Sequence, residues 1–464
     1  MDQKINFYNT ASRSKEEFKP IVEGKVGIYS CGPTVYWNQH IGNMYAFLFA
    51  DVLVRTLKYF GYEVKQVMNL TDVGHLTSDA DTGEDKMEKG AKREGLSVWE
   101  VAKKYEGQFL ESMNLLNINR PNIICRATDH IKEQIELIKI IEKNGFTYVI
   151  SDGVYFDTSR FPDYAKFANL KLEEMKDTER EEISKEKKNL SDFALWKFSP
   201  KDVTKRQMEW ESPWGVGFPG WHIECTAMST KYLGNPFDIH TGGIDHIPVH
   251  HTNEIAQGYG AFGYQTANYW MHNAFVVGRN GTKMSKSLGN LFLTQELADN
   301  GVEALAYRYM VLNSHYRKGL EFSLEGLKVA AVAFDKLKKL VVEWPDSGKI
   351  DQDYQKDFIE KISDDLALPE IMALVWKLVK DIEIKPEDKK ATILDFDKVL
   401  GLKLGEKVIE EEIPEEIKDL TQKRVKAKAG KDWAEADRLR DLIKEKGYLV
   451  EDAVDSFKIK SIDK

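Results

Sequence analysis

Residues 25–75 read KVGIYSCGPTVYWNQHIGNMYAFLFADVLVRTLKYFGYEVKQVMNLTDVGH, and this stretch decides the fold. The pattern predicts a strand over Val26–Ser30, a loop over Cys31–Gly42, a helix over Asn43–Phe60 and a second strand over Val64–Leu70. In such a unit the loop and the start of the helix lie at the carboxyl edge of a parallel sheet. Free N–H groups and the positive end of the helix dipole gather at that edge and favour bound phosphate. The sequence therefore predicts an α/β protein with a dinucleotide-binding-like parallel sheet.

The loop matches neither of the two common nucleotide-binding fingerprints, GxGxxG and GxxxxGK[ST]. It offers instead His40-Ile41-Gly42-Asn43, in which a glycine lets a ligand approach the backbone beside an imidazole. Alone this tetrapeptide is a weak signal, because HxG is more often a loop with a solvated histidine. A second segment far along the chain, Lys283-Met284-Ser285-Lys286-Ser287, places two lysines on a predicted flexible loop.

The composition is that of an ordinary globular protein, with 42% hydrophobic and 30% charged residues among 464. This length allows two to four domains, and no apolar run is long enough to span a membrane. Three cysteines cannot form a disulfide framework, and the first residues lack the layout of a signal peptide, so we expect a cytoplasmic protein. The net charge of −9 argues against a generally basic surface for nucleic acid, although phosphate contacts need only a local basic patch.

Strand and helix patterns alternate over the first part of the chain, and helices follow. Residues 74–95 predict a polar surface loop, Tyr148–Asp157 a hairpin with Asp152-Gly153 at its turn, and Leu170–Lys188 a charged surface excursion. A small C-terminal module is predicted to contain two helices and a strand at Leu449-Val450. The other predicted helices are Val98–Leu116, Ile131–Lys143, Val302–Asn313, Leu324–Glu343, Gln352–Ala367, Leu368–Lys380 and Ala391–Leu400.

Four residues that are far apart in the sequence are suitable metal ligands. Cys31 follows the first predicted strand, Cys225 follows a segment at another sheet edge, and His250 and Glu254 share one face if their segment is helical. Two thiolates, an imidazole and a carboxylate form a set suited to Zn²⁺. By residue type alone this evidence is modest, because the separations match no motif and an ordinary surface helix also carries such a His/Glu pair.

The two short segments, in this order, resemble the two signatures of class I aminoacyl-tRNA synthetases. With CGPTVY before the first signature, and with WHIEC and HHTNE between the two, the chain is similar to the cysteinyl-tRNA synthetase family from about Ile28 to Asp452. The resemblance implies a reaction in which L-cysteine and ATP, with Mg²⁺, give cysteinyl-adenylate. The 3′-terminal adenosine of tRNA(Cys) then takes the cysteinyl group. A monomer without a membrane partner is expected.

The resemblance also divides the chain into six parts. A catalytic domain is expected over residues 1–144 and 220–278, interrupted by a connective insertion over residues 145–219. The parts that follow are a KMSKS-bearing segment that contacts the tRNA stem over residues 279–322, a helix bundle over residues 323–405 and a C-terminal anticodon-binding module over residues 411–464.

The zinc ligands that the resemblance implies are Cys31, Cys225, His250 and Glu254. A single zinc ion there would bind the substrate thiolate, for which a serine hydroxyl is a poor substitute. The resemblance places walls of the cysteine pocket at Thr71 and Trp221, and it makes Asp245 a candidate for the substrate ammonium or the ribose, a choice that stays open. Three more histidines are expected to contact the ligands or the substrate, with ordinary core histidines as the alternative: His222, His240 and His251.

The resemblance places ATP contacts at both signatures. They are implied at His40, Gly42 and Asn43 beside the helix N-terminus, and at Lys283, Ser285 and Lys286 on the second loop. The adenylation step needs positioning and positive charge, and the residues implied to supply them are His40, Asn43, Lys283 and Lys286. No protein nucleophile is required.

RNA contact is expected from the C-terminal module. Lys423–Lys431 carries five basic residues and no acid, and Trp433 follows closely. Such a run is usually a solvated face, but the tryptophan can stack on a splayed base. The resemblance places anticodon-reading residues at Lys428, Trp433, Asp437 and Asp452.

Two other kinds of enzyme share parts of this pattern. A cysteine ligase for an amino sugar would use the same zinc and the same adenylate, but it lacks the C-terminal module that residues 433–452 resemble. A zinc hydrolase or deaminase would account for His222-Ile223-Glu224, but HExxH and PCxxC are absent and KMSKS would have no role. A third alternative, a catalytically silent tRNA-binding relative, is disfavoured because both signatures and all four candidate zinc ligands are intact.

Overall fold

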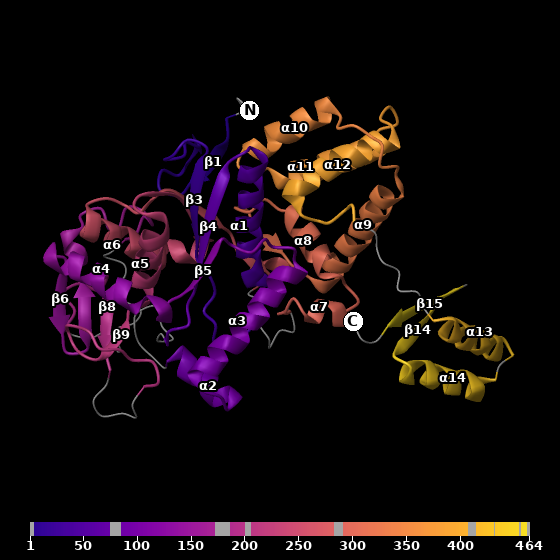
Figure 1. Cartoon of the computed structure of the whole chain (residues 1–464), viewed down its shortest axis with the longest axis horizontal. Coiled ribbons are helices and arrows are strands. Elements are labelled where there is room, and N and C mark those ends of the chain that lie inside the picture. The colour runs from indigo at the N-terminus through magenta and orange to yellow at the C-terminus, as the bar shows by residue number, and fades with distance from the viewer. Residues whose placement is uncertain are drawn as a thin grey trace. The chain divides into compact units, whose positions relative to one another are not determined.

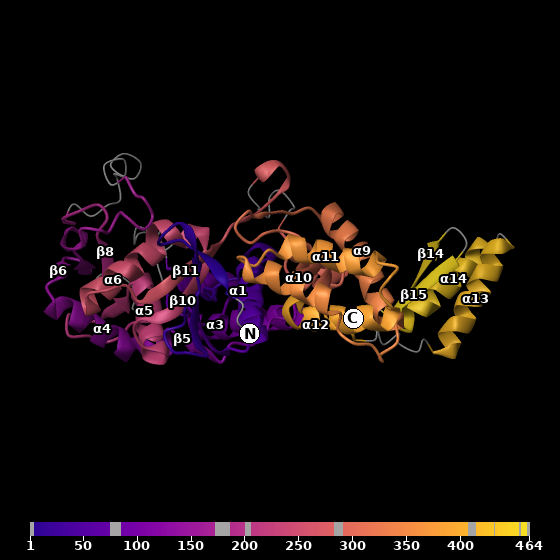
Figure 2. The same cartoon turned by 90° about the horizontal axis from the view of Figure 1, so that it is seen from above.

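The computed structural model describes residues 4–74, 85–171, 186–199, 206–282, 291–406, 414–430, 432–453 and 456–461. The chain divides into two compact units, Met1–Gly405 and Glu406–Lys464, whose elements are labelled in Figures 1 and 2. None of the helices within the described ranges combines the length and the apolar content needed to cross a membrane.

The central sheet has five strands, all parallel, which confirms the predicted parallel sheet. Their order, which the sequence pattern did not predict, is β11-β10-β3-β4-β5. The strands are β3 Lys25–Ser30, β4 Glu63–Leu70, β5 Ile123–Arg126, β10 Phe237–Gly243 and β11 Ala267–Asn273. The strand order reverses at β3, because the chain builds outward through β4 and β5 and returns on the other side of β3. Open α/β sheets bind ligands at the carboxyl ends of the strands that flank such a reversal, here Ser30 and Gly243.

Two hydrophobic cores cover the two faces of this sheet. Along β3, Val26 and Ile28 join the core that contains α1 and α3, while Tyr29 joins the core that contains α4, α5 and α6. Figure 1 shows the two helix groups on opposite sides of the strands. These helices are α1 Ile41–Tyr59, α3 Val98–Leu115, α4 Ile131–Lys143, α5 Trp221–Leu233 and α6 Thr252–Phe262.

A four-stranded antiparallel sheet, in the order β6-β7-β8-β9, interrupts the chain between α4 and α5. Its first turn consists of Ser151 and Asp152, because Gly153 already pairs with Ile150, so the predicted turn at Asp152-Gly153 was wrong by one residue. Gly153 is needed in the strand, since a Cβ there would lie 2.3 Å from the carbonyl oxygen of Trp196 on β8. The strands are β6 Thr147–Ile150, β7 Gly153–Phe156, β8 Phe193–Phe198 and β9 Gly217–Pro219.

Helix α2, Lys86–Glu94, lies within a stretch that was predicted to be a loop. Asp85 caps it by accepting hydrogen bonds from the N–H groups of the first turn, and Gly95 ends it with a φ of 68°. The cap residues were visible in the sequence, but Met87 and Ala91 are the only strongly apolar residues in this helix and both are buried. The periodic signal was therefore too weak to predict it.

Three predicted segments lie partly or wholly outside the described residues. The residues outside the described ranges are 75–84 of the polar loop, 172–185 of the charged excursion and 283–287, which form the KMSKS segment.

The remaining elements of the first unit include a short N-terminal hairpin, which the sequence analysis missed, and a group of helices. The elements are β1 Asn6–Asn9, β2 Ser14–Glu17, β12 Val276–Val277, α7 Glu296–Asp299, α8 Ala304–Leu312, β13 Leu320–Glu321, α9 Leu324–Glu343, α10 Gln352–Ser363, α11 Leu368–Lys380 and α12 Pro386–Leu400. The second unit has two helices and a hairpin, of which only one strand was predicted: α13 Glu415–Ala429, α14 Trp433–Glu445, β14 Tyr448–Ala453 and β15 Ser456–Ser461.

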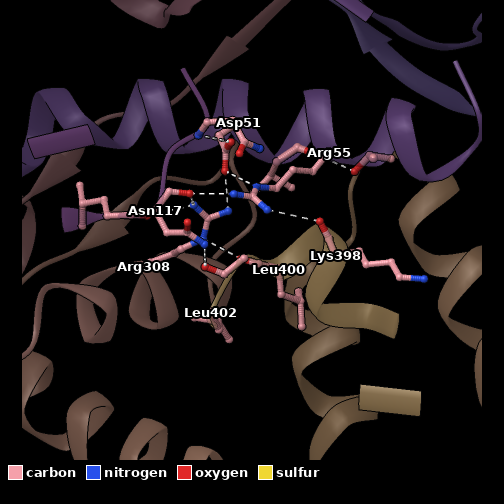
Figure 3. A network of polar contacts seen from close by, with 12 residues as sticks. Asp51, Arg55, Asn117, Arg308, Lys398, Leu400 and Leu402 are labelled. Atoms are coloured by element: carbon pink, nitrogen blue, oxygen red, sulfur yellow. Dashed lines mark hydrogen bonds and ion pairs between the residues drawn. The ribbon is translucent and has the colours of Figure 1, made fainter. Parts of the chain in front are cut away.

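A buried ionic network joins α1 to the helical region (Figure 3). Arg308 of α8 is fully buried and donates to Asp51 Oδ2 of α1 at 2.6 Å, and Arg55 donates to the same oxygen at 2.7 Å. The Arg308 guanidinium also donates to three backbone carbonyls, those of Leu116, Asn117 and Leu400. One buried side chain thus fixes the positions of α1, α8 and the end of α12 relative to one another.

Candidate active site

The first signature forms the N-terminus of α1. The N–H of Asn43 donates to His40 Nδ1 at 3.3 Å, and the His40 N–H donates to Asn43 Oδ1 at 3.2 Å, which makes a reciprocal capping box. The first turn of α1 has no acidic residue, so its dipole is open to an anion. Burial lowers the pKa of His40 to about 4, and the imidazole is therefore neutral at pH 7 and able to hydrogen bond without carrying charge.

The chain that follows the second signature lies directly against the first. The N–H of Ile41 donates to the carbonyl of Phe292 at 2.9 Å, and His40 forms an isolated β-bridge with Leu293. Although the KMSKS residues themselves lie outside the described ranges, the segment a few residues after them is held at the start of α1.

The four candidate metal ligands, Cys31, Cys225, His250 and Glu254, come together in a buried cluster. One donor atom from each lies within 4.8 Å of all the others. Cys225 lies on α5, Glu254 on α6, and His250 on the π-helical turn Ile247–His251 that leads into α6. Two thiols, an imidazole and a carboxylate at this spacing form a donor set that fits one zinc ion.

Two members of the cluster, Cys225 and Glu254, have lowered pKa values, which favours the negatively charged forms that bind a cation. Burial opposes ionisation of Cys225, but hydrogen bonds with Cys31 and His250 outweigh it and lower its pKa to about 7. In the same way the interactions of Glu254 with His240 and His250 outweigh burial and lower the pKa of that carboxyl to about 2. The same partners, Cys225 and Glu254, raise the pKa of His250 to about 10 against the effect of burial, so a metal must displace a proton there.

The other histidines form a chain of contacts behind the cluster. His222 Nδ1 lies 2.9 Å from His250 Nδ1, His240 Nε2 lies 2.9 Å from Glu254 Oε2, and His251 Nε2 lies 3.3 Å from Cys31 Sγ. A second possible ligand set, Cys31 with His240, His251 and Glu254, shares two members with the first.

Sequence reasoning missed His272, whose Nε2 lies 2.7 Å from His251 Nδ1 and whose Nδ1 lies 2.7 Å from the Thr10 hydroxyl. A histidine within a buried strand gives no signal of its own, and only the pairing of β10 with β11 brings it to the cluster.

Trp221 and Asp245 line the cavity together with Cys31, while Thr71 is buried and is not part of the lining. The Trp221 ring centroid lies 5.1 Å from that of His250. The Thr71 hydroxyl donates to Glu224 Oε2 at 2.9 Å, and burial raises the pKa of Glu224 to about 8, so this carboxyl is mostly protonated at pH 7. The sequence analysis named Glu224 only within the His222-Ile223-Glu224 pattern of the alternative zinc hydrolase, and not as a residue of the cysteine site.

Replacing Gly242 with alanine is expected to lower cysteine-dependent ATP–pyrophosphate exchange by at least about tenfold, because the protein leaves no room for a methyl group. A Cβ there would lie 2.7 Å from both His246 Nδ1 and His251 Cε1, and overpacking of a core typically costs about 1–3 kcal/mol. The exchange rate and the zinc content should fall together while circular dichroism is unchanged. Gly107→Ala, within α3, where a Cβ has nothing within 4 Å and the backbone is helical, is the matched control. Normal exchange by the Gly242 variant would contradict this reading of the site.

A cavity of about 650 Å³ opens at the strand reversal, and both the first signature and the candidate metal ligand Cys31 contribute to its lining. Its lining includes residues of the first loop, of the ends of β10 and β11, of α2 and of α5. The predicted site residues among them are Cys31, His40, Gly42, Asn43, Trp221 and Asp245.

The predicted RNA-contact residues belong to the second unit. The Trp433 side chain, at the start of α14, is 59% exposed. Asp437 forms an ion pair of 3.0 Å with Arg440, Lys428 lies on α13, and Asp452 lies in β14 paired with Phe457 of β15.

Comparison with known proteins agrees with this geometry. Residues 17–332 match the family model described as the class I tRNA synthetase (C) catalytic domain. Methionyl-tRNA synthetase from Mycobacterium tuberculosis, in a structure with methionyl-adenylate, has the same fold, with a TM-score of 0.54 and 16% identity over 82% of this chain and 90% of that one. Fold and site thus define a class I aminoacyl-tRNA synthetase.

Sequence relatives narrow the class further. Cysteine–tRNA ligase 1 of Burkholderia lata is 50% identical over 97% of this chain and 95% of its own length. The cysteine–tRNA ligase of Treponema denticola is 44% identical over 97% of this chain and 98% of its own. The chain belongs to the cysteine–tRNA ligase family, as the two signatures and the WHIEC and HHTNE segments predicted.

Proposed function

We propose that this ligase joins L-cysteine to tRNA(Cys) through cysteinyl-adenylate and selects cysteine with one zinc ion held by Cys31, Cys225, His250 and Glu254. The observation that carries the proposal is the buried cluster in which one donor atom of each residue lies within 4.8 Å of the others. A zinc ion bound there would supply a soft Lewis acid that prefers a thiolate to a hydroxyl. The serine hydroxyl would be a poor ligand for this zinc ion compared with the cysteine thiolate. The enzyme can therefore select cysteine over serine without a separate editing step.

In the proposed adenylation step the cysteine carboxylate attacks the α-phosphorus of ATP, and pyrophosphate leaves. His40, Gly42 and Asn43 bind the phosphates at the N-terminus of α1, where the helix dipole favours an anion, with Mg²⁺ on the nucleotide. Lys283, Ser285 and Lys286 close over the leaving group and neutralise its charge. No protein side chain forms a covalent intermediate.

The second unit is proposed as the anticodon-binding module, with Lys428, Trp433, Asp437 and Asp452 as its RNA contacts. The exposed indole of Trp433 supports this assignment, since a stacking surface serves single-stranded RNA. The division of the larger unit into catalytic halves, insertion, stem-contact segment and bundle is part of the same proposal, as are a monomeric state and a cytoplasmic location.

The test is aminoacylation of a tRNA with a GCA anticodon, using cysteine and ATP, with serine as the control amino acid. Charging with cysteine alone supports reaction, substrate and acceptor together. If cysteine-dependent ATP–pyrophosphate exchange occurs but the tRNA is not charged, the adenylation step is supported. The acceptor of the cysteinyl group would then be a small molecule such as an amino sugar. Absence of both activities in zinc-replete protein would overturn the proposal.

Replacing Trp433 with alanine is expected to lower kcat/KM for tRNA charging about 5- to 150-fold, since stacking of a base on an aromatic side chain is worth about 1–3 kcal/mol. Cysteine-dependent ATP–pyrophosphate exchange should stay at the wild-type rate, because the catalytic cavity lies within the other unit. The exposed Leu449→Ala, on β14 of the same unit and outside the predicted RNA contacts, is the matched control. Equal charging by the Trp433 variant would remove this residue from the RNA contacts.

A further inference from the structure

Helix α2 brings a lysine to the wall of the catalytic cavity. Lys86, the first residue of α2, lines the cavity together with Trp221, and its Nζ lies 4.7 Å from the centroid of the Trp221 ring. The same indole packs against the imidazole of His250, with ring centroids 5.1 Å apart. One aromatic side chain therefore contacts both a candidate metal ligand and the Lys86 ammonium.

Contacts at both ends of α2 hold this lysine in place. At the far end Arg93 donates to the carbonyl of Tyr36 at 2.8 Å and lies 3.6 Å from the centroid of the Trp37 ring, both in the first loop. At the near end the capping residue Asp85 accepts a hydrogen bond from Arg206. The backbone that carries Lys86 is thus fixed to the cavity wall before substrate binds, which lowers the entropic cost of a contact with it.

A free α-amino acid presents three groups to a binding site: its side chain, its ammonium and its carboxylate. In the proposed function the metal ligands account for the thiol, and the carboxylate of Asp245 is available for the ammonium. The carboxylate of the substrate needs a cation. Among the described residues that line the cavity, Lys86 is the only lysine or arginine, and the His40 imidazole there is neutral.

We propose that Lys86 binds the carboxylate of the substrate cysteine and orients it for attack on the α-phosphorus. The inference rests on the proposed function, because it places the thiol at Cys31, Cys225, His250 and Glu254. An amino acid anchored by its thiol beside His250 would pack against the Trp221 ring, and its carboxylate would come within reach of the ammonium that contacts the same ring in the same cavity. The contact is a charge-assisted hydrogen bond, the strongest kind available to a carboxylate.

The test compares two ligands that differ in the carboxylate alone, cysteine and cysteamine, by calorimetric titration of the zinc-loaded full-length protein. In Lys86→Met, which keeps an unbranched stem against Trp221, the Kd of cysteine should rise about 10- to 150-fold. The Kd of cysteamine should change less than about twofold, and the zinc content should stay at the wild-type level. Lys86→Arg, which retains the charge, should restore most of the affinity for cysteine.

Kinetics supply a second readout that a purely structural role would not reproduce. In ATP–pyrophosphate exchange the KM for cysteine should rise in Lys86→Met while the KM for ATP is unchanged. If the Kd values of cysteine and cysteamine rise equally in Lys86→Met, Lys86 only holds Trp221 in position, and the proposal is overturned. Normal cysteine binding with slow transfer to tRNA would also overturn it and assign the lysine to the acceptor end.

The same titrations separate this inference from the proposed function on which it rests. If the wild-type protein binds neither thiol, the zinc-based selection of cysteine fails and the role of Lys86 fails with it. If the wild-type protein binds both, and Lys86→Met binds cysteine as tightly, the role of Lys86 alone is refuted.

Discussion

Replacing Arg308 with methionine is expected to lower the free energy of unfolding of the larger unit by about 3–5 kcal/mol, the usual cost of removing one partner from a buried ion pair. The variant leaves Asp51, which is 2% exposed, with a charge balanced only by Arg55. It also removes the donors to the carbonyls of Leu116, Asn117 and Leu400. The measurement is denaturant unfolding followed by tryptophan fluorescence, since nine of the ten tryptophans lie within residues 1–405.

Two further variants show whether burial causes the loss. Lys139→Met breaks an exposed pair with Glu136 and should cost about 0–0.5 kcal/mol. The double variant Asp51→Asn with Arg308→Met should lose less than the sum of the two single variants, by about 1–3 kcal/mol, because the second change removes the unpaired charge that the first created. A stability of Arg308→Met within about 1 kcal/mol of wild type would show that the network carries little of the fold.

Replacing Cys225 with serine is expected to remove zinc and the selection of cysteine together. Losing one of four ligands should cost more than the 10- to 100-fold in metal affinity that residues behind the ligands typically contribute. Zinc content per chain should therefore fall in the purified variant, and cysteine-dependent ATP–pyrophosphate exchange should fall by more than about 100-fold. The ratio of cysteine to serine activation should fall with it, because a thiol and a hydroxyl of similar size are otherwise hard to distinguish.

Cys125 provides the matched control for this experiment. It is also buried, at 3% exposed, but its Sγ donates to the carbonyl of Met68 and it belongs to neither possible ligand set. Cys125→Ser keeps a donor at that position and should retain both zinc and selectivity. Full zinc content with unchanged preference for cysteine in Cys225→Ser would exclude the metal from amino-acid selection.

Segments whose burial follows a clear period were predicted almost to the residue. Ile131–Lys143, Leu324–Glu343 and Leu368–Lys380 have the predicted bounds, because each helix buries one apolar stripe and has a polar opposite face. Helix α2 buries only Met87, Gly90 and Ala91, a face too short and too weakly apolar to be recognised, and its caps and contacts with the first loop add to its stability. The N-terminal hairpin, made of NFYN and SKEE, has too few apolar residues to give a strand signal.

Residue types alone gave only modest evidence for the candidate metal ligands, and the family resemblance supplied the rest of the prediction. Cys31 and Glu254 meet because β10 pairs with β3 and brings α6 beside the first loop, and no local pattern encodes that pairing. Lys86 and Arg308 were overlooked for a related reason. Lysine and arginine are usually solvent-exposed, so residue type alone argues against a place in a cavity wall or in a core.

The position of β3 in the middle of the sheet has a consequence for synthesis on the ribosome. This strand is the first of the five to be made, and β4 can pair with it soon afterwards. Its other edge stays without a partner until Phe237–Gly243 has emerged, after the whole antiparallel insertion. An exposed strand edge is a template for pairing with other chains. The nascent protein therefore carries one unpaired edge of β3 until β10 has been synthesised. A chaperone that shields unpaired strands would act in that interval.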